Sequence, residues 1–102
     1  MEKTYEGISV DVNEEGYLTD LSQWTKEVGN GIAKEEGVEM TDKHWEVINY
    51  LQEQYRNENP LNIRKVGKSG VVSIKEFYAL FPNGPLKVSS RVSGIPKPIS
   101  CI

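Results

Sequence analysis

The sequence predicts a small, mainly helical fold: an orthogonal helical bundle with an N-terminal β-hairpin and an extended C-terminal arm. Apolar residues recur at helical spacing in several short segments of the chain. Gly and Pro residues separate these segments, so consecutive short helices must turn and pack across one another. Near the C-terminus, Pro96 and Pro98 exclude a helix, because proline fixes φ and lacks an N–H, and they favour an extended arm.

Length and composition agree with one soluble domain. The 102 residues are 37% hydrophobic and 26% charged, as in globular rather than disordered chains. No apolar run approaches the roughly 20 residues that span a bilayer. Residues 1–6 lack the apolar stretch of a signal peptide, and a single cysteine suits a reducing compartment. We therefore expect a cytoplasmic protein.

The first 40 residues predict a hairpin and one helix. Residues 4–12 alternate weakly around Glu6-Gly7, which favours a tight β-turn. A first helix is expected to begin at a cap formed by Asp20 or Ser22 and to end near Gly37. Its apolar face would consist of residues at helical spacing: Leu21, Trp24, Val28 and Ile32.

Two more helices are expected between Thr41 and Val66. Thr41 is a good cap for a helix of about 42–58, which Asn59-Pro60 ends. The segment from Leu61 to Val66 is long enough for about one and a half helical turns. The predicted buried stripe of the longer helix is Trp45, Ile48, Leu51 and Tyr55, widened by Val47 and Tyr50.

Two helices and the arm complete the chain. Ser73 and Glu76 have the spacing of a capping box, in which each side chain accepts a hydrogen bond from the other's backbone N–H. Pro85 suits the first position of a last helix, and Gly94 suits the position just after it. The predicted division is therefore a helical body, residues 1–94, and a mobile arm, residues 95–102.

Charge is distributed unevenly along the chain, whose net charge is −3. Residues 1–59 contain 14 acidic and 5 basic side chains, whereas residues 60–102 contain one acid, Glu76, and seven bases. The single cysteine, Cys101, belongs to the basic part. This asymmetry is either an ordinary two-toned surface or a positive field that favours a thiolate or persulfide anion, or attracts an acidic partner.

Cys101 is the only strong nucleophile in the sequence. It stands one residue from the C-terminus, behind a Pro-x-Pro spacer that disfavours deep burial. A free thiol has a pKa of about 8.5, so only a few per cent is thiolate at neutral pH. The terminal carboxylate would raise this pKa, whereas a nearby cation would lower it. The candidate thiolate or persulfide stabilisers are Lys97, Arg91, Arg64 and Lys65.

Other kinds of chemistry lack their residues. One histidine and one cysteine, His44 and Cys101, cannot form a structural zinc set, and we expect His44 to be a surface or cap-region residue. The stretch Gly29-Asn30-Gly31 lacks the further glycine and the preceding strand of a phosphate-binding loop. We therefore expect neither a metal nor a cofactor. The large aromatic residues are expected to be core: Trp24, Trp45, Tyr55, Phe77 and Phe81.

The C-terminal motifs resemble the DsrC/TusE family of sulfur-relay proteins. They are Leu80-Phe81-Pro82-Asn83-Gly84-Pro85, then Gly94-Ile95-Pro96-Lys97-Pro98, then the penultimate Cys101. The resemblance implies an orthogonal helical bundle with an N-terminal hairpin and a mobile arm. It also implies that Cys101 accepts sulfur as a persulfide and passes it on. In the TusE branch the sulfur goes from a relay complex to a tRNA thiouridylase for 2-thiouridine synthesis; DsrC members work with dissimilatory sulfite reductase.

The resemblance also favours one branch. DsrC members use a second arm cysteine about eleven residues before the penultimate one, and here that position is Ser90. A hydroxyl cannot form a disulfide with Cys101, so a single-cysteine, TusE-like sulfur carrier is predicted. It would catalyse no reaction independently and act at most as a sulfurtransferase within a relay. The expected partners are an upstream sulfur donor and a downstream acceptor, either a tRNA thiouridylase or a sulfite reductase.

Two further functions stay open at this point. Short crossed helices with a basic second half are compatible with a helix-turn-helix module that binds nucleic acid, although the acidic first half would repel phosphate. The second alternative is an adaptor whose arm docks into a partner's cleft without sulfur transfer. Serine in place of Cys101 would be tolerated in both cases, which separates them from the sulfur carrier.

Overall fold

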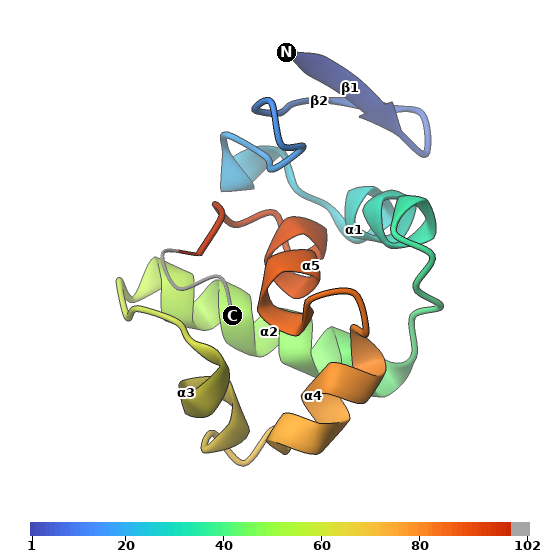
Figure 1. Ribbon diagram of the computed structural model, residues 1–102. Helices are drawn as coiled ribbons and strands as arrows, with labels where there is room; N and C mark the ends of the chain where they lie inside the picture. The colour runs from blue at the N-terminus through green and yellow to red at the C-terminus, as the bar shows by residue number, and fades with distance from the viewer. Residues whose placement is uncertain (99–102) are drawn as a thin grey trace.

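A computed structural model describes residues 1–98 (Figure 1). The hairpin strands are β1 (Glu2–Tyr5) and β2 (Ile8–Asp11), and a 3₁₀ turn, η1 (Leu21–Gln23), follows them. The α-helices of the described region are α1 (Lys26–Glu35), α2 (Asp42–Arg56), α3 (Ile63–Gly67), α4 (Ile74–Leu80) and α5 (Pro85–Val92). The predicted helical bundle with an N-terminal β-hairpin is therefore confirmed.

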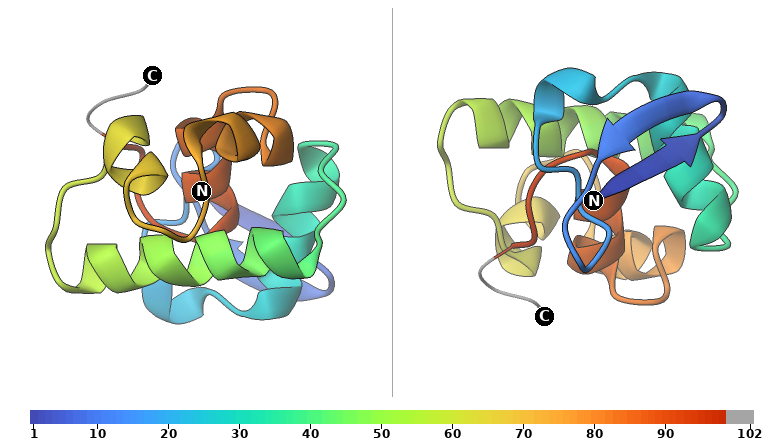
Figure 2. Two further views of the ribbon diagram at one scale, coloured as in Figure 1. Left: turned by 90° about the horizontal axis from the view of Figure 1, so that it is seen from below. Right: turned by 90° about the horizontal axis from the view of Figure 1, so that it is seen from above.

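The hairpin turns where the sequence predicts. Strands β1 and β2 are antiparallel, with Tyr5 opposite Ile8, so Glu6-Gly7 is the two-residue connection. Gly7 has a φ of +81°, a conformation that glycine adopts without steric strain. Figure 2 shows the hairpin beside α1, and β1 and α1 are in contact.

The first helix differs from the prediction. Asp20 does act as a cap, but it accepts the Ser22 N–H and caps only η1. The α-helix starts at Lys26, where the Thr25 hydroxyl accepts a hydrogen bond from the Val28 N–H at 3.2 Å. A second capping residue thus divides the expected helix into two parts.

The buried face of α2 agrees with the predicted stripe in part. The helix is capped by Thr41 as predicted, but Tyr55 is 42% exposed and Trp45 is only partly buried. Three predicted residues, Val47, Ile48 and Leu51, are buried, and His44 and Gln52 complete the buried face. The apolar residues of α2 spread over more than one side of the helix, so their spacing alone does not decide which side is buried.

His44 is a cap-region residue, one of the two locations expected for it, and it is buried. Its Nδ1 accepts the Thr41 N–H at 3.0 Å, which leaves the Nε2–H to donate to the Leu80 carbonyl at 2.9 Å. Its ring also contacts Phe81 edge-on, with centroids 5.1 Å apart. His44 therefore links the start of α2 to the end of α4.

The capping signals of the last two helices are confirmed. Ser73 and Glu76 form the reciprocal capping box of α4, and Pro85 is the first residue of α5. Helix α3 begins two residues later than expected, because Asn62 caps it through a hydrogen bond from the Lys65 N–H at 2.7 Å.

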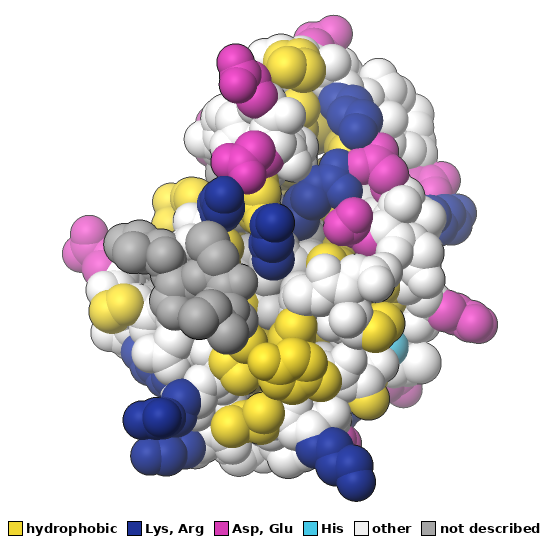
Figure 3. All heavy atoms as spheres, viewed as in Figure 1, with side chains coloured by type: hydrophobic (Ala, Val, Ile, Leu, Met, Phe, Trp, Pro, Cys, Tyr) yellow, Lys and Arg dark blue, Asp and Glu magenta, His cyan; other side chains and the backbone are white. Residues whose placement is uncertain are grey.

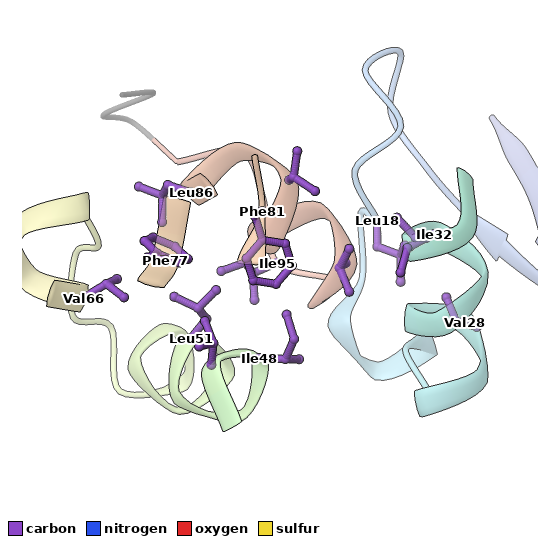
Figure 4. Packing of buried hydrophobic residues seen from close by; sticks show 14 of the residues in the cluster. Leu18, Val28, Ile32, Ile48, Leu51, Val66, Phe77, Phe81, Leu86 and Ile95 are labelled. Carbon is purple, nitrogen blue, oxygen red and sulfur yellow. The ribbon is translucent and has the colours of Figure 1, made fainter. Parts of the chain in front are cut away.

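Helix α5 lies at the centre of the bundle and contacts α1, α2 and α4. Figure 4 shows the side chains that fill the space between these elements, with Phe77 and Phe81 from the α4 region facing Ile48 and Leu51 of α2. Ile95, the first residue of the predicted arm, belongs to this core and is 2% exposed. No helix among residues 1–98 is both long and apolar enough to cross a membrane.

Candidate functional site

The base of the arm is held by side chains from two distant helical segments. Trp24 Nε1 donates to the Val92 carbonyl at 2.7 Å, and Gln52 Nε2 donates to the Ser93 carbonyl at 2.7 Å. These bonds satisfy carbonyls at the end of α5, which lack partners within the helix. Neither role is predicted from the sequence, although Gln52 interrupts the buried face of α2 with a polar group that needs a partner.

A glycine directs the chain into the arm. Gly94 has a φ of +75°, and a Cβ at this position would lie 2.6 Å from Trp24 Cδ1. Backbone conformation and space therefore both favour glycine there. The Ile95 N–H then donates to the Ser90 carbonyl at 3.2 Å, which fixes the path of the chain over α5 as far as Ile95.

The described part of the arm borders a cavity of about 260 Å³. The cavity lies between α5, the end of α2 and the segment that leads into α3, and its lining is mainly apolar. The residues around it are Tyr55, Asn59, Pro60, Leu61, Ser90, Ile95, Pro96, Lys97 and Pro98. Tyr55 was expected in the core, and its exposure is explained by this position on the cavity wall.

Ser90 contributes a buried hydroxyl to this cavity. Its side chain is fully buried, and its Oγ has no hydrogen-bond partner among the described residues. An unpaired buried hydroxyl is unfavourable by about 1–3 kcal/mol, so such a group needs an explanation. The position assigned to the absent second arm cysteine thus lies against the base of the arm.

The predicted cationic residues occupy different surroundings. Lys97 lines the cavity and donates to Glu15 Oε2 at 2.8 Å. Lys65 is not among the lining residues, but its Nζ donates to the carbonyl of Pro60, which is one of them, at 3.0 Å. Arg64 is exposed on α3. Cys101, whose thiolate these cations are predicted to stabilise, lies outside the described residues, so this role stays a prediction for each of them.

Arg91 lies on another side of α5, away from Ser90. It lines a separate polar cavity with Glu15 and Glu36. Its guanidinium donates to the Gly16 carbonyl at 3.1 Å and to the Tyr5 hydroxyl at 3.0 Å, and it pairs with Glu35 and Glu36. Its hydrogen bonds join α5 to the hairpin, the loop at Gly16 and the end of α1. This is the arrangement of a structural cation.

The Arg91 cluster predicts a loss of stability in acid. Burial would raise the pKa of Glu35, but hydrogen bonds from Lys3 and Arg91 outweigh it, and the pKa lies below its ordinary value of 4.5. A carboxylate with a lowered pKa stabilises the fold above the unfolded-state pKa and loses this effect as the pH falls through the folded-state pKa. The melting temperature should therefore fall as the pH drops below 4.5.

Circular dichroism melts of the wild type and of Glu35→Gln test this expectation. The variant should be less stable than the wild type at neutral pH, and the difference should shrink as the pH falls below 4.5 and the wild-type carboxylate becomes protonated. A difference that stays constant across this range would contradict the assignment of the acid effect to Glu35.

No group of three or more potential metal ligands occurs in the region that the structure describes. Within residues 1–98, the residues with polar side chains around the cavity are Tyr55, Asn59, Ser90 and Lys97, and the other lining residues are apolar. This arrangement can position a short extended segment.

Comparison with known proteins gives matches along nearly the whole chain. The model of the DsrC-like protein family matches residues 4–102. Sulfurtransferase TusE of Salmonella typhimurium is 36% identical over 107 aligned residues, and that of Escherichia coli is 35% identical; each alignment covers 96% of this chain and 97% of the relative.

Solved structures with a similar fold are also DsrC proteins. The solution structure of Allochromatium vinosum DsrC has a TM-score of 0.80 and 37% identity. The crystal structure of the oxidized gamma subunit of dissimilatory sulfite reductase (DsrC) from Archaeoglobus fulgidus has a TM-score of 0.82 and 29% identity. In both cases the match covers 100% of this chain and 100% of the other.

Proposed function

Because this chain belongs to the DsrC-like family, we propose that it is a sulfur carrier whose Cys101 accepts and passes on persulfide sulfur. The observation that carries the proposal is the match over residues 4–102, which includes the penultimate cysteine, together with nearly full-length similarity to TusE sulfurtransferases. The carrier acts in the cytoplasm, between a sulfur-donor relay complex and an acceptor enzyme that makes 2-thiouridine in tRNA.

The chemistry needs one thiol and leaves the protein unchanged after each cycle. The Cys101 thiolate attacks the outer sulfur of a donor persulfide; a new S–S bond forms, and the donor leaves as a thiolate. The resulting Cys101 persulfide is then attacked at its outer sulfur by an acceptor thiolate. The outer sulfur moves to the acceptor, and Cys101 departs as a thiolate. No external oxidant or reductant enters either step.

Ser90 favours the single-cysteine mode over the DsrC-like alternative. A partner of dissimilatory sulfite reductase that works through two arm cysteines needs a thiol at residue 90, and this chain has a hydroxyl there. The solved relatives named as sulfite reductase subunits share the fold, which is compatible with either mode. The residue at position 90 is therefore the feature that favours delivery toward tRNA thiolation.

Intact-mass spectrometry tests the carrier function. The wild-type protein, incubated with a cysteine desulfurase and cysteine or with the donor relay complex in persulfidated form, should gain one sulfur atom that a reductant removes. Cys101→Ser should gain none. The proposal is wrong if the wild type gains no sulfur, or if Cys101→Ser gains as much as the wild type. The same variant separates a carrier from an adaptor, which would bind its partner equally well with serine at this position.

A further inference from the structure

Some basic side chains of the described region form ion pairs there and others do not. In the N-terminal half, Lys3 pairs with Glu35, Lys34 with Glu6, and Lys43 with Glu46. The exposed cations of α3 and α4 differ, because Arg64, Lys68 and Lys75 have no ion-pair partner within residues 1–98. Lys26, Arg56 and Lys87 also have no ion pair among residues 1–98, but they are dispersed over α1, the end of α2 and α5, whereas Arg64, Lys68 and Lys75 lie together in the α3–α4 region.

These cations surround exposed apolar side chains. Ile74 and Tyr78 are 43% and 45% exposed, and they lie one turn apart on α4. Ile74 also packs against Gly67 of α3, where an added Cβ would lie 2.2 Å from Ile74 Cγ1. We call the surface formed by Arg64, Lys68, Ile74, Lys75 and Tyr78 the α3–α4 face.

The α3–α4 region contrasts with the rest of the visible surface. Figure 3 shows hydrophobic side chains gathered over the lower part of the molecule, with Lys and Arg side chains on both sides; a second group of Lys and Arg side chains lies in the upper middle, among Asp and Glu side chains. An apolar centre with a charged rim is the usual anatomy of a protein–protein interface, and exposed tyrosine is prominent among residues that dominate binding energy.

This face lies beside the start of the arm. Pro60 and Leu61, which lead into α3, line the same cavity as the arm residues Pro96 and Pro98. A protein seated on the α3–α4 face is therefore held next to the segment that precedes Cys101. Such binding would raise the effective concentration of the partner's thiol or persulfide around the arm.

We propose that the α3–α4 face docks an acidic, apolar-centred surface of the protein that exchanges sulfur with Cys101. The inference rests on the proposed function and adds the surface that selects the partner. Complementary charge accelerates association and excludes partners with a basic surface. Nucleic acid is the less favoured occupant, because the chain is acidic overall, with a net charge of −3, and Ile74 and Tyr78 offer apolar contact at the centre of the face.

The test compares sulfur transfer from and to proteins with transfer from a small molecule. Lys68→Glu/Lys75→Glu and Tyr78→Ala are mixed separately with the persulfidated donor relay complex, with the tRNA thiouridylase, and with glutathione persulfide. We expect the rate of sulfur transfer with at least one of the two proteins to fall about tenfold or more in both variants. The charge reversals remove electrostatic steering, and Tyr78→Ala removes an interface anchor. The rate with glutathione persulfide should stay within about twofold, because no docking is needed.

The matched control is Lys26→Glu/Lys34→Glu, which makes the same change in net charge at two exposed positions of α1 and should leave all rates near those of the wild type. Unchanged rates with both proteins in the face variants would overturn the inference. So would an equal fall with glutathione persulfide, or specific retention of total tRNA that Lys68→Glu/Lys75→Glu abolishes. If the wild type takes sulfur from neither the relay complex nor glutathione persulfide, the proposed function itself fails, and this inference fails with it.

Discussion

Replacing Arg91 by methionine should lower the free energy of unfolding by about 3 kcal/mol, because it removes a buried cation that several elements share. Arg91 is 8% exposed, and it binds the Gly16 carbonyl, the Tyr5 hydroxyl and two carboxylates on α1. Methionine fills a similar volume but donates no hydrogen bond, so these acceptors lose their partner. Urea denaturation followed by circular dichroism measures the change.

A matched variant separates this effect from a general loss of charge on α5. Lys87 is an exposed residue of the same helix with no ion pair in the described part of the chain, and Lys87→Met should change the free energy of unfolding by less than about 0.5 kcal/mol. If Arg91→Met is as stable as the wild type but alkylation of Cys101 slows at a given pH, Arg91 is a thiolate stabiliser rather than a structural cation.

Local signals predicted most of the helix boundaries. Thr41, Ser73 and Pro85 open their helices where the sequence places them, since capping and proline geometry depend on a few neighbouring residues. The hairpin at Glu6-Gly7 is of the same kind. The start of the first helix could not be predicted as well, because Asp20 and Thr25 are both competent caps and only the packed structure shows that each caps a different turn.

The remaining differences between the predicted and the observed structure depend on contacts between distant parts of the chain. Tyr55 was assigned to the core from its spacing, but the face that α2 buries depends on where α5 lies, and α5 is contributed by residues far along the chain. Arg91 and Ser90 are neighbours in sequence, yet they line different cavities because successive residues of a helix point about 100° apart. The resemblance identified residue 90 as important, and only the structure shows its hydroxyl against the base of the arm without a partner.

Ser90→Cys should convert the single-cysteine carrier into a protein that locks itself under mild oxidation. Ser90 and Pro98 line the same cavity, and Cys101 follows Pro98 by three residues, which span at most about 10 Å when extended. A disulfide needs Cα atoms only about 5–6 Å apart, so the two thiols are within reach of each other. The oxidised variant should be a monomer without free thiols, and it should accept no sulfur until a reductant is added.

Controls at neighbouring positions make this outcome specific to the cavity. Ser90→Ala removes the unpartnered hydroxyl, so it should fold normally and keep one free thiol after oxidation. Ser89→Cys adds a buried thiol on the same helix, but residue 89 does not line the cavity, and it should not cross-link to Cys101. Intact mass after alkylation, together with non-reducing electrophoresis, distinguishes these states. If oxidised Ser90→Cys forms only dimers or retains both free thiols, Cys101 does not approach residue 90. The serine at that position would then have no direct bearing on how the carrier presents its sulfur.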